Sequence, residues 1–179
     1  HKEMMIEEFV TGTMHDVNAV FDFNGDYNPL GCFDRYFQEG AVIESGAVYP
    51  SQLSKELIDE AYELTRRAAI ALGITWGPVK SDLVLTQQGF QILELSTRLH
   101  GPKGSLGLSS MVDQPSHLER VINVITNPNG SVPKLNTVSG VAAYEMIDHP
   151  GKMSSRIKGI DKLKSKGFEL LLLNNTLSG

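Results

Sequence analysis

Cysteine and long hydrophobic runs are scarce in this sequence, and each absence excludes a class of protein. Cys32 is the only cysteine in the 179-residue chain, so no intramolecular disulfide can form and no thiolate cluster can hold zinc. No apolar run approaches the ~20 residues that cross a bilayer. The opening HKEMMIEEFV also lacks a basic region followed by an apolar stretch. We therefore expect a protein of the reducing cytoplasm with no membrane partner.

Positive charge is also in short supply. Sixteen Lys and Arg residues stand against twenty-one Asp and Glu, which gives a formal net charge of −5. The basic residues are scattered and do not predict the continuous basic face that binding to a phosphate backbone requires. Nucleic acid is therefore excluded as an expected partner. Hydrophobic residues make up 41% of the chain, enough to bury a core in one compact domain with an appendage.

The opening of the chain reads as antiparallel sheet. Met4–Val10 and His15–Phe23 are rich in β-prone residues, and each predicts a strand. The turn-forming stretch NGDYNPLG then predicts a hairpin that returns through Gly31–Phe37. With the helices that follow, this pattern predicts an α+β fold in which helices pack on an antiparallel sheet.

Two helices are predicted. Ser51–Leu72 is the clearer one, because apolar residues recur at helical spacing on one face: Leu53, Leu57, Ile58, Ala61, Leu64, Ala68 and Leu72. Ser54 is the expected N-cap, and Gly73 stands where a C-terminal glycine belongs. A shorter helix is expected over Pro115–Ile125.

The composition predicts three segments. Residues 1–126 form the main domain, and residues 127–136 form a linker because TNPNGSVPKLNT is rich in Pro, Gly and Asn. Residues 137–179 contain two strand-like runs, VSGVAAYEMI and GFELLLL, and are expected to form a small, incomplete β-containing lobe.

The most informative stretch is a predicted hairpin around Gln87-Gln88-Gly89. A three-residue loop with glycine last is a common connection, and it would pair Thr86 with Phe90 and Val84 with Ile92. The same register puts Asp82 opposite Glu94. Two like charges in directly opposed positions are destabilising, so we expect something to compensate them.

Strand periodicity puts Ser96 and Arg98 on the face that carries Glu94. Two carboxylates with a neighbouring hydroxyl are hard oxygen ligands, so Asp82, Glu94 and Ser96 predict a Mg²⁺ site, with Mn²⁺ as the alternative ion. Arg98 could hold a phosphate or carboxylate, and Val84 and Ile92 would form the floor of the ligand site. The opposing interpretation is that Asp82 and Glu94 are surface residues neutralised by Lys80 or Arg98.

At ILELSTRLHG the sequence resembles the ATP-grasp enzymes, whose second metal-binding strand commonly reads Glu-x-Asn-x-Arg and whose first carries a carboxylate about a dozen residues earlier. MIEEFVTGTMHDVNAV and the order of the following elements extend the resemblance over roughly residues 4–125. Ser96 departs from the pattern, because the family usually has Asn there. The resemblance implies the C-terminal part of an ATP-grasp domain. Because no glycine-rich phosphate loop precedes Glu7, we expect the N-terminal lobe of the same protein to be missing.

The resemblance also implies residue roles. Glu7 would accept the adenine amino group, the backbone at Glu8 and Val10 would pair with the ring edge, and Val84 would pack on its face. His15 could approach the ribose. The metal on the triphosphate would be held by Asp82 and Glu94, and Arg98 would orient the phosphorylated intermediate or the incoming carboxylate. Arg35 could reach a phosphate, but a structural pair with Asp34 or Glu39 is the expected role.

The implied activity is that of a carboxylate–amine ligase, closest to the dipeptide and amino-acid ligases, which uses ATP and magnesium to form an acyl phosphate that an amine attacks. Its partners would be a small-molecule carboxylate and an amine, and a homodimer is left open. The nearest rivals are biotin carboxylases and carbamoyl-phosphate-synthase-like enzymes. Biotin enzymes commonly follow the arginine with Val-Glu-His, where this chain has LHGPKG. A non-catalytic nucleotide-binding or assembly module is the alternative from another class.

Overall fold

The computed structural model describes residues 4–40, 43–137, 140–146 and 160–167. The chain divides into two compact units, His1–Met146 and Ile147–Gly179, which are described separately. In the second unit the described element is the short helix α4 (Ile160–Lys164). All other elements belong to the first unit.

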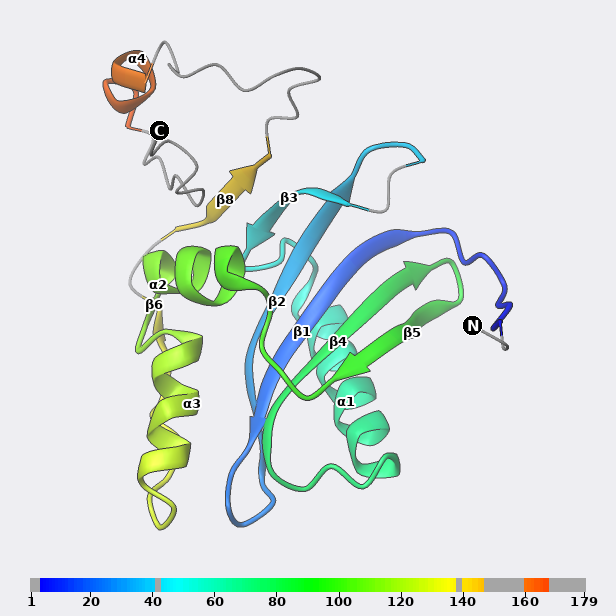
Figure 1. Cartoon of the computed structure of the whole chain (residues 1–179), viewed down its shortest axis with the longest axis vertical. Coiled ribbons are helices and arrows are strands. Elements are labelled where there is room, and N and C mark those ends of the chain that lie inside the picture. The colour runs from blue at the N-terminus through cyan, green and yellow to red at the C-terminus, as the bar shows by residue number, and fades with distance from the viewer. Residues whose placement is uncertain (1–3, 41–42, 138–139, 147–159, 168–179) are drawn as a thin grey trace. The chain divides into compact units, whose positions relative to one another are not determined.

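The first unit is built on a six-stranded sheet in which every neighbouring pair is antiparallel, with the order β5-β4-β1-β2-β3-β8 (Figure 1). The strands are β1 (Thr13–Phe21), β2 (Tyr27–Phe37), β3 (Glu44–Tyr49), β4 (Gly77–Thr86), β5 (Gly89–Ser96) and β8 (Ala142–Glu145). The predicted α+β class and the predicted hairpin of β1 with β2 are confirmed.

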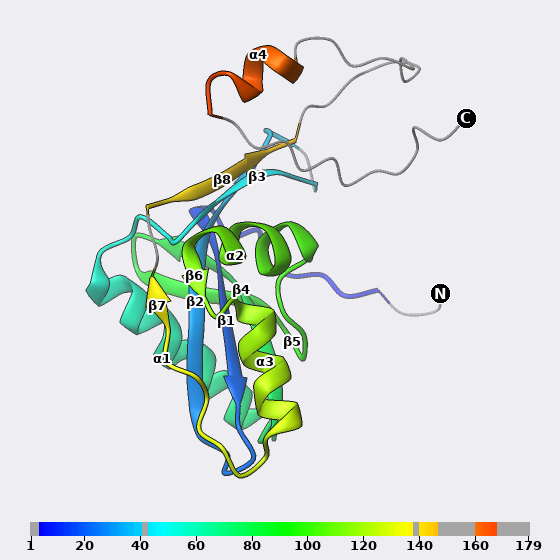
Figure 2. The ribbon, with the colours of Figure 1, turned by 90° about the vertical axis from the view of Figure 1, so that its left-hand side faces the viewer.

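The two faces of the sheet are covered by different helices. Val17 and Phe21 of β1 pack with Ala61 and Ala69 of the long helix α1 (Lys55–Ala71). Val20 packs in the opposite direction, against helix α3 (His117–Thr126). Figure 2 shows the sheet between these two helices. Strand alternation therefore points the side chains of odd-numbered β1 residues towards α1 and those of even-numbered residues to the other face.

Helix α1 begins where the sequence predicts, because the Ser54 side chain accepts a hydrogen bond from the Leu57 amide. Gly73 follows the helix with a φ of 75°, a left-handed conformation that glycine adopts without strain. The buried positions are Ala61, Thr65 and Ala69. Leu72, predicted to join the buried face, is 67% exposed because it lies past the last helical turn.

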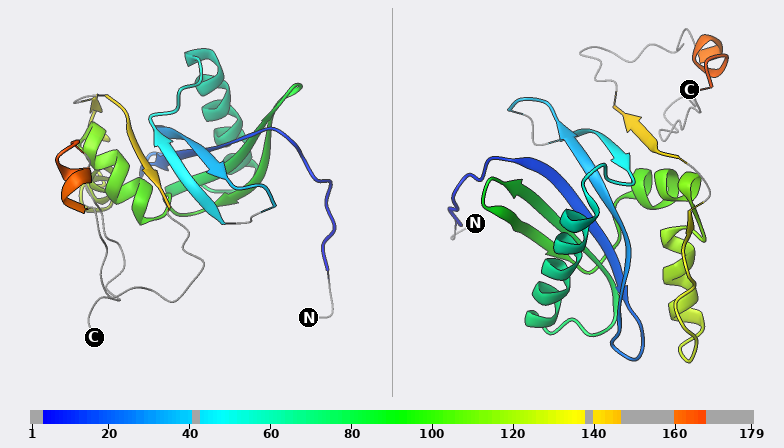
Figure 3. Two further views of the ribbon diagram at one scale, coloured as in Figure 1. Left: turned by 90° about the horizontal axis from the view of Figure 1, so that it is seen from above. Right: turned by 180° about the vertical axis from the view of Figure 1, so that it is seen from behind.

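The other face of the sheet carries a run of short elements: the π-helix η1 (Lys103–Leu108), α2 (Ser109–Val112), β6 (Asp113–Gln114), α3 and β7 (Asn136–Thr137) (Figure 3). The sequence predicted α3 but not η1 or α2. Helix α3 has a reciprocal capping box between Ser116 and Glu119. Among the described residues, no helix is long and apolar enough to span a membrane.

Two predictions about the ends of this unit are wrong. Met4–Val10 forms no strand: it leads away from the sheet with exposed side chains and pairs with no described residue (Figure 1). Its β-prone residues pair with neither edge strand of the sheet, and propensity alone does not form a strand. The predicted boundary at residue 137 also moves, because β8 joins the sheet beside β3. The GFELLLL strand lies almost wholly outside the described residues.

Candidate functional site

Asp82 and Glu94 are cross-strand partners in β4 and β5, as the sequence predicts. The turn differs, because Thr86 pairs with Gly89 across a two-residue loop. This shifts the register by one, so Leu83 lies opposite Ile92, and an irregularity at Leu93 then restores the predicted pair.

The altered register changes which side chains accompany the two carboxylates. Phe90 and Ile92 pack with Leu83 in the core beneath α1, so Ile92 does not form the predicted floor of the site. Val84 stays on the face of Asp82 by strand alternation, but it is buried. A Cβ atom on Gly12 would lie 2.6 Å from Val84 Cγ1, so the Gly12 backbone covers Val84.

Asp82 is already engaged by two cations. Its Oδ1 atom accepts from Arg35 Nη1 and from Lys80 Nζ. Lys80 precedes Asp82 by two residues in β4 and lies opposite Ser96 of β5. The predicted compensation of the carboxylate pair is therefore present, and Lys80 supplies part of it, as the opposing interpretation held.

Glu94 is the exposed member of the pair. Its Oε1 atom accepts a 2.6 Å hydrogen bond from Ser96 Oγ, which places Ser96 on the predicted face. This hydrogen bond, followed by the charges of Lys80, Arg98 and Arg35, lowers the pKa of Glu94. Arg98 is exposed and donates to the neighbouring Leu99 carbonyl at 3.0 Å. Its guanidinium is therefore held by only a local contact.

Asp16 is the main site residue that sequence reasoning missed. It lies opposite Asp82 in the register of β1 with β4, and it is fully buried. Its carboxylate accepts from Asn18 Nδ2 at 2.9 Å and contacts His100 Nδ1. The side-chain Oδ1 atom of Asn18 in turn accepts from the His100 backbone amide at 2.6 Å. The signal that could have revealed it is the pair of polar residues Asp16 and Asn18, two positions apart in an otherwise largely apolar strand.

Arg35 of β2 contacts carboxylates on three other strands, β1, β3 and β4, at this face of the sheet. Besides Asp82, its Nε lies 3.2 Å from Glu44 Oε1 and 3.8 Å from Asp16 Oδ2. The predicted pair with Asp34 or Glu39 is wrong, because Asp34 points to the other face of the sheet. Burial opposes the charge of Arg35, but Asp82, Glu44 and Asp16 together raise its pKa above the usual value.

His15 is not brought to this site. It is buried on the α1 face, where Nδ1 lies 2.9 Å from Asp34 Oδ1 and Nε2 lies 2.7 Å from Thr13 Oγ1. The edge of its ring meets Phe90, with the ring centroids 6.0 Å apart. The predicted approach to a ribose bound beside Asp82 fails for a geometric reason. Asp16, not His15, shares the face of Asp82, and strand alternation turns neighbouring side chains apart.

The residues expected to contact adenine lie upstream of the sheet. Glu7, Glu8 and Val10 belong to the irregular segment before β1, and both glutamates are exposed. The structure therefore leaves their side chains and backbone available, but it does not bring them into contact with Asp82 or Glu94.

The side chains beside Asp82 match a hard divalent cation in the type of ligand atom they offer. Asp82, Glu94 and Ser96 offer carboxylate and hydroxyl oxygens on one face, the ligands that Mg²⁺ takes alongside water and phosphate. Asp16 and Glu44 add negative charge, so three carboxylates, those of Asp16, Glu44 and Asp82, contact the two cations Arg35 and Lys80. Within the described ranges, however, no three or more His, Cys, Asp or Glu side chains are arranged to hold a metal ion. A metal ion at Asp82 and Glu94 would therefore need further ligands from water or phosphate.

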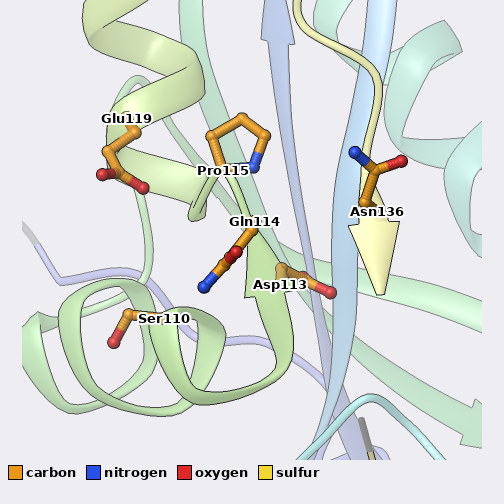
Figure 4. Close-up of a pocket in the computed structure, with 6 residues that line it drawn as sticks. All are labelled: Ser110, Asp113, Gln114, Pro115, Glu119 and Asn136. Atoms are coloured by element: carbon orange, nitrogen blue, oxygen red, sulfur yellow. The ribbon is translucent and has the colours of Figure 1, made fainter. Parts of the chain in front are cut away.

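A cavity of about 550 Å³ lies elsewhere, where α2, β6, α3 and β7 meet, and Figure 4 shows the side chains that line it: Ser110, Asp113, Gln114, Pro115, Glu119 and Asn136. Its carboxylates already have structural partners, because Asp113 accepts from Tyr49 and Glu119 accepts from Ser116. We therefore place the candidate site at Asp82 and Glu94.

Comparison with known proteins identifies the fold. No family model and no curated protein sequence matches the chain. An L-amino acid ligase from Bacillus licheniformis aligns with a TM-score of 0.67 and 20% identity, over 80% of this chain and 36% of the ligase. A biotin carboxylase from Campylobacter jejuni aligns with a TM-score of 0.60 and 19% identity, over 76% of this chain and 30% of the carboxylase.

A phosphoribosylaminoimidazole carboxylase ATPase subunit from Aquifex aeolicus aligns with a TM-score of 0.56 and 24% identity, over 72% of this chain and 39% of that subunit. These structures are ATP-grasp enzymes, so the predicted ATP-grasp fold is confirmed. The chain spans between 30% and 39% of the length of the three proteins.

Proposed function

We propose that this chain is the metal-binding, C-terminal part of an ATP- and magnesium-dependent carboxylate–amine ligase that acts through an acyl-phosphate intermediate. The observation that carries the proposal is the pairing of Asp82 with Glu94 on one face of the sheet, with Ser96 bonded to Glu94. The ATP-grasp fold supports it, and one of the compared structures is an L-amino acid ligase.

In this proposal Asp82, Glu94 and Ser96 hold Mg²⁺, or Mn²⁺ in its place, with phosphate oxygens and water as the remaining ligands. The bound metal would offset negative charge on the transferring phosphoryl group. The residues of the chain then position the partners. Arg98, whose guanidinium has only a local contact, would turn to the acyl phosphate or the substrate carboxylate and bind it in bidentate fashion.

The nucleotide base would lie along the segment that precedes β1. Glu7 would accept the adenine amino group, and the backbone at Glu8 and Val10 would pair with the ring edge. Val84 would supply apolar surface only if the Gly12 backbone that covers it moves. His15 would not contact the nucleotide, because it lies on the other face of the sheet, against Asp34.

The rest of the nucleotide site would come from an N-terminal lobe of the same protein. The matched region makes up only 30% to 39% of the compared enzymes, and no glycine-rich phosphate loop precedes Glu7 in this sequence. We propose that the whole protein works in the cytoplasm and that this chain by itself is inactive.

Two other functions have specific support. A carboxylase is favoured by the structural similarity to biotin carboxylase and to the carboxylase ATPase subunit, although both TM-scores are below that of the amino acid ligase. A non-catalytic module is favoured by the contacts of Arg35 and Lys80 with Asp82, which give that carboxylate a structural role without metal.

Phosphate release from ATP by the whole protein separates these functions. We expect release that depends on magnesium and on an amino acid or another small carboxylate together with an amine. Release stimulated by bicarbonate alone would favour the carboxylase. Absence of release with every carboxylate, amine and bicarbonate supplied would favour the non-catalytic module.

A further inference from the structure

Lys80 is a buried ammonium beside the proposed metal pair. Its side chain is 4% exposed, and Nζ contacts Asp82 Oδ1 and lies 3.9 Å from Asp16 Oδ2. In the sheet register Lys80 lies opposite Ser96, as Asp82 lies opposite Glu94. The lysine and the proposed metal would therefore share the Asp82 carboxylate.

The position of Lys80 has a clear electrostatic reason. Asp16 and Asp82 are directly opposed in neighbouring strands, and like charges in such positions repel. An ammonium between them offsets the repulsion, and the two carboxylates in turn stabilise a cation that is costly to bury without a partner. A divalent ion on Asp82 would offset the same repulsion, so the ammonium and the metal have overlapping roles.

We propose that Lys80 is the resident cation of this site: it occupies Asp82 in the metal-free protein and moves towards Asp16 when a divalent metal binds Asp82 and Glu94. This inference rests on the proposed function, because it takes those two carboxylates as the metal pair. Asp16 gives the displaced ammonium a second partner that is already within 3.9 Å.

The same contacts explain why Lys80, and not Arg35, is the cation that moves. Arg35 is held by Glu44 as well as by Asp82, and its guanidinium lies 5.1 Å from the centre of the Phe37 ring. A planar guanidinium with partners on three strands keeps one geometry. Lys80 has a flexible four-carbon chain, and both of its carboxylate partners lie on the same side of the sheet, so a small change in its torsions exchanges one for the other.

Competition between the two cations makes a quantitative prediction. Removing the positive charge of Lys80 should leave Asp82 free for the metal and strengthen metal binding by about tenfold or more, since unit charges at ~4 Å interact strongly in a partly buried site. The metal-free variant should be less stable than wild type because Asp16 and Asp82 lose a shared cation. Metal should restore more of that stability in the variant than it adds to wild type.

The experiment is a titration of the 179-residue chain with Mn²⁺, followed by electron paramagnetic resonance of the free ion, together with thermal unfolding with and without Mn²⁺. Wild type is compared with Lys80→Met, and Lys80→Arg is the matched control that keeps the charge. Each protein is also measured with Glu94→Gln. We expect tighter binding and larger stabilisation by Mn²⁺ in Lys80→Met, wild-type-like or weaker binding in Lys80→Arg, and loss of binding in every Glu94→Gln form.

The outcomes separate this inference from the proposed function. If wild type and Lys80→Met bind Mn²⁺ with equal affinity, and Glu94→Gln abolishes binding in both, the competition between Lys80 and the metal is overturned. The assignment of Asp82 and Glu94 as the metal pair is then still supported. If binding in no protein depends on Glu94, the metal pair and the competition fail together. If Lys80→Met does not fold, Lys80→Gln replaces it. Failure of both neutral variants to fold even with millimolar Mn²⁺ would make Lys80 a purely structural residue and overturn the proposal.

Discussion

Asp16 lies directly opposite Asp82 across β1 and β4, and the two carboxylates share the cations Arg35 and Lys80. Asp16 also binds His100 and Asn18 in a fully buried position. The buried Asp16 carboxylate therefore organises this face of the sheet. Arg35 and Lys80 connect it to Asp82, and His100 connects it to the segment that follows Arg98.

We expect Asp16→Ala to lower the free energy of unfolding by about 3 kcal/mol, because it leaves buried polar partners without their carboxylate. Urea unfolding of the purified chain measures this. The control is Asp59→Ala, which removes the exposed i,i+4 pair with Lys55 on α1 and should cost less than about 1 kcal/mol. Equal effects of the two substitutions would contradict the role given to Asp16.

Gly104 and Gly101 provide a matched pair of substitutions near His100. A Cβ atom at Gly104 would lie 2.2 Å from His100 Cδ2, whereas one at Gly101 would meet no atom within 4 Å. Because Asp16 holds the His100 ring, we expect Gly104→Ala to destabilise the chain by about 1 to 3 kcal/mol. Gly101→Ala should leave stability nearly unchanged. Comparison of their unfolding midpoints in urea tests this, and a neutral Gly104→Ala would show that the His100 ring is free to move.

His117 makes stability depend on pH. Burial lowers its pKa below the ordinary value of 6.5 in the folded state, although Asp113 lies 3.5 Å away and Tyr49 Oη 2.9 Å away. Nδ1 has no hydrogen-bond partner among the described residues. The unfolded chain therefore takes up a proton first as pH falls below about 6.5, and stability is lost by at most about 1.4 kcal/mol per pH unit.

We expect His117→Gln to be less sensitive to this fall in pH than wild type. The measurement is the free energy of unfolding in urea at about pH 7.5 and about pH 5.5 for both proteins. Equal losses in the two proteins would assign the pH dependence to other groups.

The sequence predicted β1, β2, β4, β5, α1, α3 and the Asp82–Glu94 pair because each rests on local periodicity or on a short hairpin, whereas β3 was not predicted and β8 was assigned to a separate lobe. The hairpin prediction succeeded although its loop was assigned one residue too long, since the irregularity at Leu93 restored the register. Irregularities of this kind depend on tertiary packing, and they moved Ile92 to the opposite face.

The remainder of the site could not be predicted because it depends on residues far apart in the chain. Arg35 meets Asp82 across 47 positions, and His100 meets Asp16 across 84. His15 and Asp16 are both polar and both buried, so composition gave no indication of which one shares the face of Asp82. Met4–Val10 has strand-forming residues, but pairing with a sheet edge depends on tertiary packing, which the local pattern does not specify.

The isolated chain should fold but bind ATP weakly. The sheet and α1 bury a core of their own, whereas in the proposed function most phosphate contacts would come from an N-terminal lobe outside these 179 residues. Losing several such hydrogen bonds, at ~1.5 to 3 kcal/mol each, weakens affinity by orders of magnitude. Calorimetry with ATP and Mg²⁺ on the 179-residue chain checks this. Micromolar binding or measurable phosphate release would show that the site is complete without another lobe.

Substrate-dependent phosphate release by the whole protein carrying Glu94→Gln is the decisive test of the proposed metal pair. Glu94 is exposed and bonded to Ser96, so the substitution should leave the unfolding free energy within about 0.5 kcal/mol of wild type. Turnover should fall by about a hundredfold or more, because charge stabilisation at the transferring phosphoryl group is lost. Glu63→Gln, on the exposed face of α1, is the control and should keep full activity. Normal turnover in a folded Glu94→Gln protein would contradict the assignment of Asp82 and Glu94 as the metal pair.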